Sequence, residues 1–302
     1  MKKSKLLYIS MNRTEKILGW LYMAFSLLCL PAALTWVNGQ LADPLDEATL
    51  NFVFYLTNFL FIAGIFFRFL RASLVAAWRD IWNFIQAVIL GYVAYLAASK
   101  AMEFIMPLLM PGFSNINDAA IAELAKANYT LMLVGVVFLA PVAEEILFRG
   151  LVQRTMLPFG KNFAILVSSL TFGLFHGNLL QTPYAFVVGL VLGYVAAEYH
   201  ILWAIVLHVI NNLVLGDLLY RVLAPFPEDV MNLIVWGIIL AFTVAAVIVL
   251  IVKRREVGAW LRREKLVLPY VGCYFTCAGT IAILLVLGIS TIITTVAMIT
   301  PL

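Results

Sequence analysis

The sequence predicts an all-α integral membrane protein, a polytopic bundle of eight or nine helical spans with a cytoplasmic N-terminus. Of its 302 residues, 64% are apolar and 12% are charged, and the mean hydropathy is +1.01. Soluble domains carry roughly 45–50% apolar and about 25% charged residues. So few polar residues could not cover so large an apolar core, and the composition therefore excludes soluble, disordered and nucleic-acid-binding chains.

Long apolar runs mark the expected spans, because about 20 apolar residues cross the hydrocarbon core of a bilayer. A polar, amphipathic connector at 107–128 follows the third run, the sixth run is short, and the ninth is long enough to be tilted. No repeat or soluble domain is visible, so residues 1–302 are expected to form a single membrane domain. The nine runs are residues 17–37, 52–70, 81–106, 129–156, 163–180, 184–198, 202–223, 233–252 and 268–299.

The basic residues determine the expected orientation. Seventeen of the 20 lysines and arginines fall in four clusters, and with nine spans all four clusters lie on the same side, whereas the opposite loops are acidic. The positive-inside rule places that side, with the N-terminus, in the cytoplasm. The clusters are residues 1–16, 68–79, 149–161 and 253–265. The last one is predicted to be a basic cytoplasmic loop that is attracted to anionic lipid headgroups.

The three cysteines do not predict a thiol or metal site. Cys29, Cys273 and Cys277 lie in apolar runs, the last two one helical turn apart, and no pairing of a cysteine with a histidine has the spacing of a metal site. We expect them to fill space between helices. The cysteines therefore predict no thiol chemistry, and no cofactor is expected.

The fourth expected span contains Glu144, Glu145 and Arg149. Ionisable groups inside a span are costly, so each of them suggests a function. Glu145 and Arg149 are four residues apart on one helical face and are expected to form an ion pair. Glu144 is rotated by about 100° from Glu145 and has no partner within its own helix. Glu144 is therefore the candidate for proton-transfer chemistry.

Two further spans carry polar residues at helical spacing. The fifth contains Phe172 and His176, and the seventh contains His208 and Asn212. Taken singly, each histidine or asparagine is more simply explained by a hydrogen bond between helices. Brought together with Glu144, they suit hydrolysis: Glu144 and His176 would polarise a water, while His208 and Asn212 would donate hydrogen bonds to an oxyanion.

These three motifs, in this order, resemble those of the CAAX prenyl endopeptidase and bacteriocin-processing family of glutamic intramembrane proteases, also called the abortive-infection family. The resemblance covers residues 129–215, which we take as the catalytic core. It implies that Glu144, with His176, activates the water, that His208 and Asn212 stabilise the oxyanion, and that Glu145, Arg149 and Phe172 support the site. It also implies a helical membrane core that is open to the cytoplasmic side and needs no metal.

The function predicted is cleavage of a peptide bond in a small peptide or a lipidated, CAAX-like protein. The expected partners are membrane lipids and that substrate, with no nucleic acid, and the basic loops favour a prokaryotic plasma membrane. Two alternatives stay open. One is a zinc-dependent membrane hydrolase with Glu144, His176 and His208 as ligands. The other is a non-catalytic immunity or adaptor protein, or a proton-coupled transporter that uses Glu144 and His176 as a relay.

Overall fold

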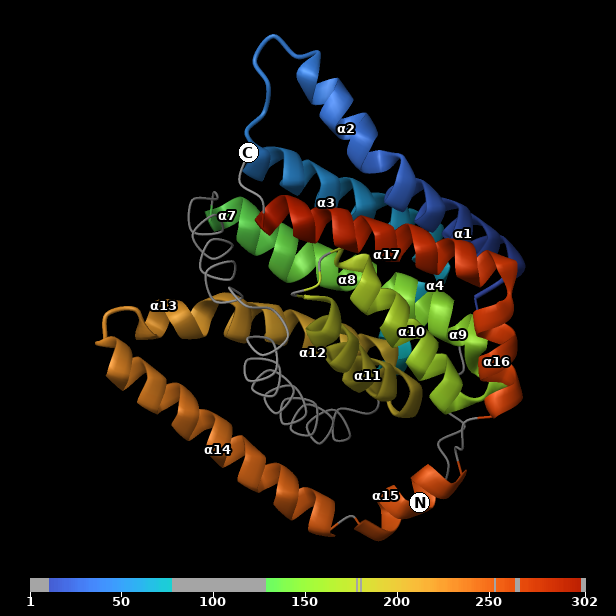
Figure 1. The fold of residues 1–302 in the computed structure, drawn as a ribbon, viewed down its shortest axis with the longest axis vertical. Coiled ribbons are helices and arrows are strands. Elements are labelled where there is room, and N and C mark those ends of the chain that lie inside the picture. The colour runs from blue at the N-terminus through green and yellow to red at the C-terminus, as the bar shows by residue number, and fades with distance from the viewer. Residues whose placement is uncertain are drawn as a thin grey trace.

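The computed structural model describes residues 11–77, 129–177, 179, 181–252, 254–263 and 267–299, and within these ranges the chain forms helices and no strand (Figure 1). The expected third span, 81–106, and the connector 107–128 lie outside the described residues. The helices are α1 (Arg13–Leu28), α2 (Leu30–Gly39), α3 (Glu47–Ile65), α4 (Phe67–Ala77), α7 (Tyr129–Met132), α8 (Ala140–Glu145), α9 (Arg154–Met156), α10 (Lys161–Phe175), α11 (Thr182–Glu198), α12 (Ile201–Ile210), α13 (Leu219–Leu223), α14 (Glu228–Val252), α15 (Arg254–Arg263), α16 (Leu268–Thr276) and α17 (Ala278–Ile299).

Short segments of other helical types join some of these α-helices. Three have the wider π-helical pattern, in which the amide of residue i bonds to the carbonyl of residue i−5, and one is a 3₁₀ turn. They are the π segments η1 (Leu133–Leu139), η2 (Ile146–Gln153) and η4 (Asn211–Leu218), and the 3₁₀ turn η3 (Leu157–Phe159). With them, 129–156 is one unbroken helical stretch, and so is 201–223.

Three of the expected single spans are divided in two. The 17–37 run bends by 49° between α1 and α2, and the 268–299 run bends by 70° between α16 and α17. Pro31 accounts for the first bend, because a proline in the first turn of α2 has no amide proton and its ring clashes with the preceding turn. The 52–70 run is divided at Phe66, where α3 ends and α4 begins.

Helix length bears on how the chain could cross a membrane. Within the described residues, no single helix is long and apolar enough to span a bilayer by itself. The α1–α2 and α16–α17 pairs reach that length and composition as bent units. The number of spans and their orientation therefore remain predictions from the sequence.

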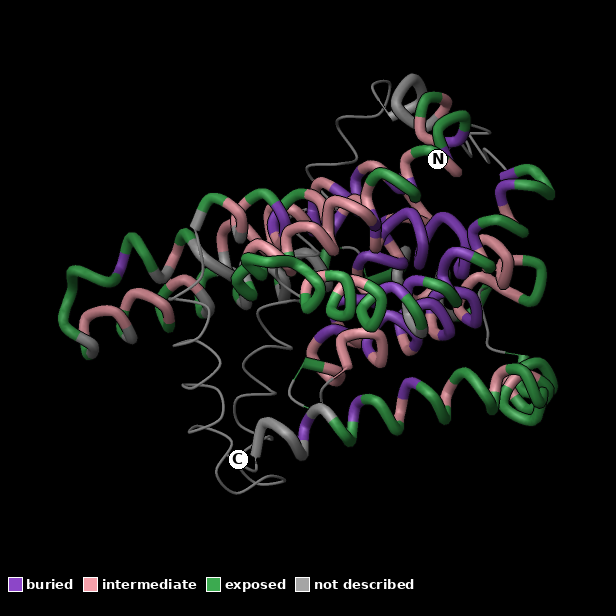
Figure 2. The backbone as a smooth tube through the Cα atoms, turned by 90° about the horizontal axis from the view of Figure 1, so that it is seen from above, coloured by how far each residue is buried: buried purple, intermediate pink, exposed green. Residues whose placement is uncertain are grey.

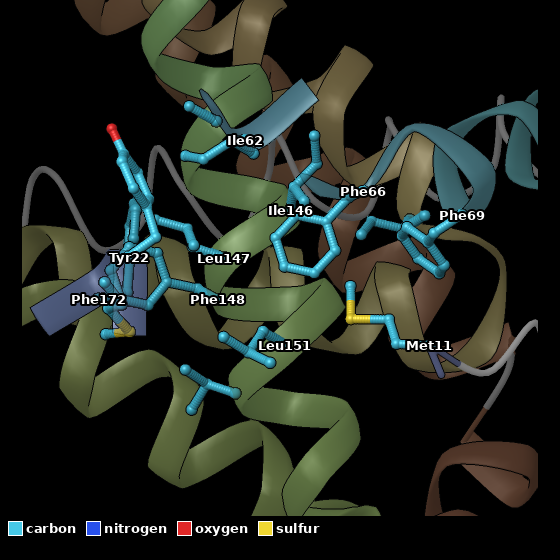
Figure 3. Packing of buried hydrophobic residues seen from close by; sticks show 14 of the residues in the cluster. Met11, Tyr22, Ile62, Phe66, Phe69, Ile146, Leu147, Phe148, Leu151 and Phe172 are labelled. Atoms are coloured by element: carbon cyan, nitrogen blue, oxygen red, sulfur yellow. The ribbon is translucent and has the colours of Figure 1, made fainter. Parts of the chain in front are cut away.

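The core of the bundle surrounds the helix that carries Glu144 and Glu145. Phe148 and Leu151 of η2 have no exposed surface, and neither do Phe66 and Phe69 on the α3–α4 side (Figure 3). The buried residues gather in the middle of the bundle (Figure 2), whereas α14 and α15, along the lower edge in Figure 1, are mostly exposed where described. The helix that carries Glu144 and Glu145 is thus held by apolar contacts on several sides.

Glycines allow α10 and α11 to pack closely. A Cβ atom at Gly173 would lie 2.8 Å from the carbonyl oxygen of Thr182, and one at Gly189 would lie 3.1 Å from the Cα of Ser169. Gly177 ends α10 in the left-handed conformation (φ 70°), as glycines commonly do one residue beyond a helix. His176 is consequently the last residue before the chain turns back into α11.

Candidate functional site

Glu144 and Glu145 lie at a change of helix type. They are the last two residues of α8, and η2 starts at the next residue. On α12, the π segment η4 likewise starts at Asn211, beside Asn212. Such π segments inside α-helices occur frequently at functional sites, because they shift the side chains that follow relative to an unbroken α-helix.

Glu145 and Arg149 form the ion pair that their spacing predicts. Arg149 Nη1 lies 2.8 Å from Glu145 Oε1, and neither side chain has any exposed surface. Arg149 also donates from Nη2 to the carbonyl of Gly189, at 3.2 Å, and its guanidinium lies 4.3 Å from the centre of the Phe172 ring. Arg149 therefore connects the helix that carries Glu144 and Glu145, here called the first-motif helix, with both α11 and α10.

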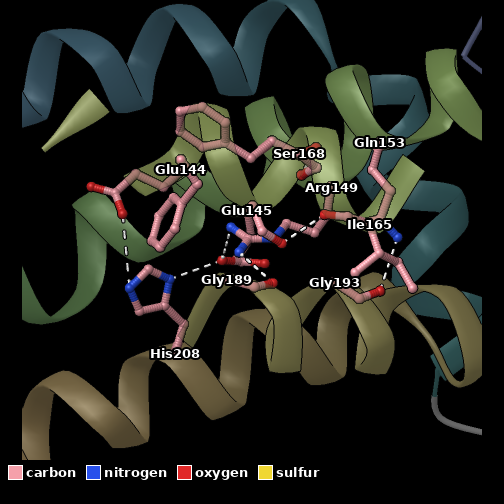
Figure 4. Close-up of polar contacts among 12 residues, drawn as sticks. Glu144, Glu145, Arg149, Gln153, Ile165, Ser168, Gly189, Gly193 and His208 are labelled. Atoms are coloured by element: carbon pink, nitrogen blue, oxygen red, sulfur yellow. Dashed lines mark hydrogen bonds and ion pairs between the residues drawn. The ribbon is translucent and has the colours of Figure 1, made fainter. Parts of the chain in front are cut away.

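Both glutamates approach the same imidazole. His208 Nδ1 lies 2.9 Å from Glu145 Oε1, and His208 Nε2 lies 3.8 Å from Glu144 Oε2 (Figure 4). Glu145 and His208 are fully or almost fully buried, whereas the Glu144 side chain keeps 19% of its surface exposed. Glu144 is thus the carboxylate of this cluster that solvent or a substrate can reach.

Phe172 links His176 to the cluster. Its ring meets the His176 ring edge-on at 4.8 Å between centres, and the His208 ring edge-on at 5.6 Å. His176 is half-buried, and its Nδ1 lies 2.9 Å from the carbonyl oxygen of Phe172. The ring of Phe172 thus contacts Arg149 and both histidines, which gives this predicted supporting residue a physical position in the site.

Asn212 reaches the same helix as the glutamates. Its Nδ2 donates to the carbonyl oxygen of Val136 in η1, at 3.1 Å, and its Oδ1 accepts from Asn211 at 3.1 Å. In the π-helical register, residue 141 would bond to the carbonyl of residue 136, but Pro141 has no amide proton. Pro141 therefore does not compete in that register with Asn212 for the carbonyl of Val136.

Gln153 is a buried polar residue that the sequence analysis did not identify. Its Nε2 donates to the carbonyl oxygen of Gly193 at 2.9 Å, one turn along from the bond between Arg149 and Gly189. The available signal was its spacing, since Gln153 follows Arg149 by four residues on the same helical face. Together the two side chains fix the first-motif helix against α11.

The zinc alternative needs three ligands at one point. Among the residues that the structure describes, no three histidine, cysteine, aspartate or glutamate side chains are grouped so that they could hold a metal ion. Glu144, His176 and His208 therefore lie in one region of the bundle without forming a ligand set.

The three cysteines are exposed and free of disulfides.

A carboxylate and an imidazole beside each other among apolar helices have the chemistry of a hydrolase site. Residues 126–214 match the family model of the Type II CAAX prenyl endopeptidases, Rce1-like. No curated protein and no solved structure matches the chain. The match confirms the resemblance to the CAAX protease family over this segment, which holds every predicted site residue, and this family is one of membrane-embedded proteases.

Proposed function

We propose that this chain is an intramembrane endopeptidase that hydrolyses a peptide bond of a small peptide or a lipidated, CAAX-like protein. The observation that carries the proposal is the arrangement of Glu144, Glu145 and His208. One carboxylate is neutralised by an arginine, and the other is partly exposed beside an imidazole. The match to the CAAX endopeptidase family supports the reaction class.

Glu144 is proposed as the base that takes a proton from the attacking water, because it is the reachable carboxylate. His176, placed by Phe172, would help to orient that water. The oxyanion of the tetrahedral intermediate would be stabilised by His208 and Asn212. The amide nitrogen of Asn212 has two protons, and the bond to Val136 engages one of them, so the other can be donated.

The orientation predicted from the basic clusters places the reaction at the cytoplasmic side of the membrane. Arg149 and Arg154 follow the glutamates on the same helix, and in this orientation they lie toward that side. A lipidated C-terminal segment anchored in the cytoplasmic leaflet would then meet Glu144 without crossing the bilayer. Comparing the cleavage rates of one model peptide with and without its lipid tests whether the lipid is part of the substrate.

The experiment compares wild-type protein with Glu144→Gln in lipid nanodiscs, using a farnesylated CAAX peptide with a fluorophore and a quencher on either side of the expected cleavage point. Removal of a general base lowers rates about 10²- to 10⁴-fold, and we expect a loss in this range. The matched control is Glu198→Gln, the same chemical change at a carboxylate that pairs with Lys161 away from the site. We expect the control to cleave as the wild type does.

Peptidomes of membranes that contain either protein extend the test to substrates other than this peptide. Peptides that accumulate with wild type and disappear with Glu144→Gln would identify the substrate and support the proposal. Cellular function that survives Glu144→Gln without any change in the peptidome would favour the adaptor alternative. Activity that a chelator removes and stoichiometric zinc restores would favour the zinc hydrolase.

A further inference from the structure

Glu145 has two partners on the same oxygen. Its Oε1 lies 2.8 Å from Arg149 Nη1 and 2.9 Å from His208 Nδ1. Arginine is always protonated in proteins, and a buried cation requires a counter-ion, so Glu145 is the anion of this pair. An ionised carboxylate only accepts hydrogen bonds. The hydrogen in the short contact with His208 therefore belongs to the imidazole and sits on Nδ1.

We propose that Glu145 fixes His208 in the tautomer with its proton on Nδ1, so that Nε2 faces Glu144 as a proton acceptor. A neutral imidazole has one donor nitrogen and one acceptor nitrogen, and the partner of one decides the role of the other. Glu145 is in this view a positioning residue, and its pairing with Arg149 is part of that role. The tautomer itself does not depend on the proposed function, whereas its catalytic consequence rests on it.

The consequence changes the role of His208. A neutral His208 with an unprotonated Nε2 cannot donate to an oxyanion, so it becomes a donor only after it receives a second proton. The separation of 3.8 Å between His208 Nε2 and Glu144 Oε2 is too long for a direct hydrogen bond and suits transfer after a small movement or through a water. Glu144 and His208 then act as one proton-carrying pair.

The proton balance of the reaction follows. The water oxygen bonds to the scissile carbonyl carbon, and one water proton passes to Glu144 and then to His208 Nε2. The imidazolium stabilises the oxyanion. When the oxyanion collapses and the C–N bond breaks, the leaving nitrogen takes this proton, and both Glu144 and Nε2 return to their starting states. The second water proton stays with the new carboxyl group.

Among the described residues, few other charges around His208 could fix its protonation. On α8 and η2 these are the two glutamates and Arg149, and α10 contributes His176 through the Phe172 ring. Tyr55 of α3 interacts with Glu144. The ionic groups described on the other helices that pack against α12 are engaged elsewhere or exposed: Glu198 with Lys161, Arg68 with Glu15, and Arg71 at the surface.

The test is ¹⁵N NMR of the full chain labelled at histidine, in lipid nanodiscs. The sequence has three histidines, so replacement of each by glutamine assigns the signals. Ring nitrogen shifts distinguish protonated from unprotonated nitrogen. At a pH where the ring is neutral, we expect His208 to show a protonated Nδ1 and an unprotonated Nε2. A protonated Nε2 with a bare Nδ1 would overturn the proposal, and this state is read in the wild-type protein, with the glutamine variants used only to assign the signals.

A pair of variants tests the cause. The double variant Glu145→Leu with Arg149→Met removes the acceptor without leaving a buried charge, and we expect His208 to lose its preference for the Nδ1 proton. Glu144→Gln is the matched control, since it keeps the Glu145 contact and should keep the tautomer. A double variant that still shows the wild-type tautomer contradicts the role of Glu145. Because none of these readouts uses a substrate, they can fail while peptide cleavage still depends on Glu144, or succeed where cleavage is absent.

Discussion

Asn212, on the seventh expected span, donates its side-chain amide to the main-chain carbonyl of Val136, at 3.1 Å, on the helix that bears both glutamates. The bond therefore joins the helix of His208 and Asn212 to the main chain of the helix that carries Glu144 and Glu145. Pro141, five residues after Val136, has no amide proton that could compete for this carbonyl in a π-helical register. A proline inside an expected span thus has a specific consequence for the site.

Pro141→Ala tests that relationship. Alanine restores an amide proton that competes with Asn212 for Val136, so we expect cleavage to fall by roughly tenfold or more as Asn212 loses its position. The thermal midpoint should hold or rise, since a proline in a helix interior costs about 3 kcal/mol relative to alanine. Peptide cleavage and thermal unfolding in the same nanodiscs measure the two effects.

The control for this change is Pro183→Ala in the first turn of α11, where an amide proton has no partner within the helix. We expect it to leave cleavage unchanged. Equal activity of Pro141→Ala and wild type would show that Asn212 does not need its bond to Val136.

Gly189 and Gly193 lie where an added Cβ would make a tight contact. A Cβ at Gly189 would lie 3.1 Å from the main chain of Ser169, and one at Gly193 would lie 3.0 Å from Gln153 Oε1. Overpacking of this kind costs about 1–3 kcal/mol, and we expect Gly189→Ala to lower the free energy of unfolding by that amount. Denaturation by SDS in mixed micelles measures it.

Gly237 in α14 is the matched control, because a Cβ there meets no atom within 4 Å. Gly237→Ala should be neutral or should stabilise the protein by up to about 1 kcal/mol through helix propensity alone. If both alanine variants change the free energy of unfolding by the same amount and sign, the close packing of α10 on α11 does not make a side chain at position 189 unfavourable.

Arg149→Met leaves Glu145 as a buried charge without its cation. Breaking a buried ion pair from one side costs about 3–5 kcal/mol, whereas removing both partners is often close to neutral. We therefore expect Arg149→Met to unfold far more easily than the wild type, and the added change Glu145→Leu to recover most of the loss. A double-mutant cycle of unfolding free energies measures the coupling between Glu145 and Arg149. If the losses of the two single variants simply add up in the double variant, the two residues do not stabilise each other as a buried ion pair.

How far the sequence predicts the site depends on whether a contact lies within one helix or between two. The pairing of Glu145 with Arg149 follows from their spacing, because residues four apart share a helical face, and the structure confirms the contact. The approach of both glutamates to His208 does not follow, since it depends on the rotation of α8 against α12. Gln153 escaped notice because its acceptor is a main-chain carbonyl, which leaves no pattern in side-chain types.

The fold shows the same division. Apolar runs predict where helical chain lies, and the 129–156 run coincides with an unbroken helical stretch. Hydropathy does not report breaks inside a run, because the residues on both sides of Phe66 or Cys277 are equally apolar. A proline alone does not decide the question either, because Pro31 lies at the first bend whereas Pro141 lies inside the unbroken stretch 129–156.

His200 gives a prediction about pH. It caps α12 by accepting from the amide of Leu202 through Nδ1, at 3.2 Å, and its buried Nε2 has no hydrogen-bond partner among the described residues. Burial, and then the nearby Arg154, lower the pKa of His200 from 6.5 to about 4. Between these values the unfolded chain binds a proton that the folded chain does not, so folding stability falls as the pH drops from 6.5 to 4 and this contribution levels off below 4.

The change His200→Asn isolates that effect, because asparagine can also cap a helix but does not titrate. We expect the free energy of unfolding of the wild type to decline relative to that of His200→Asn as the pH is lowered from 7 to 4, with both measured by SDS denaturation in buffered micelles. Above pH 6.5 the difference between the two proteins should be constant. A difference that stays the same over the whole range would mean that His200 takes up its proton equally well in the folded and unfolded chains, contrary to its burial beside Arg154.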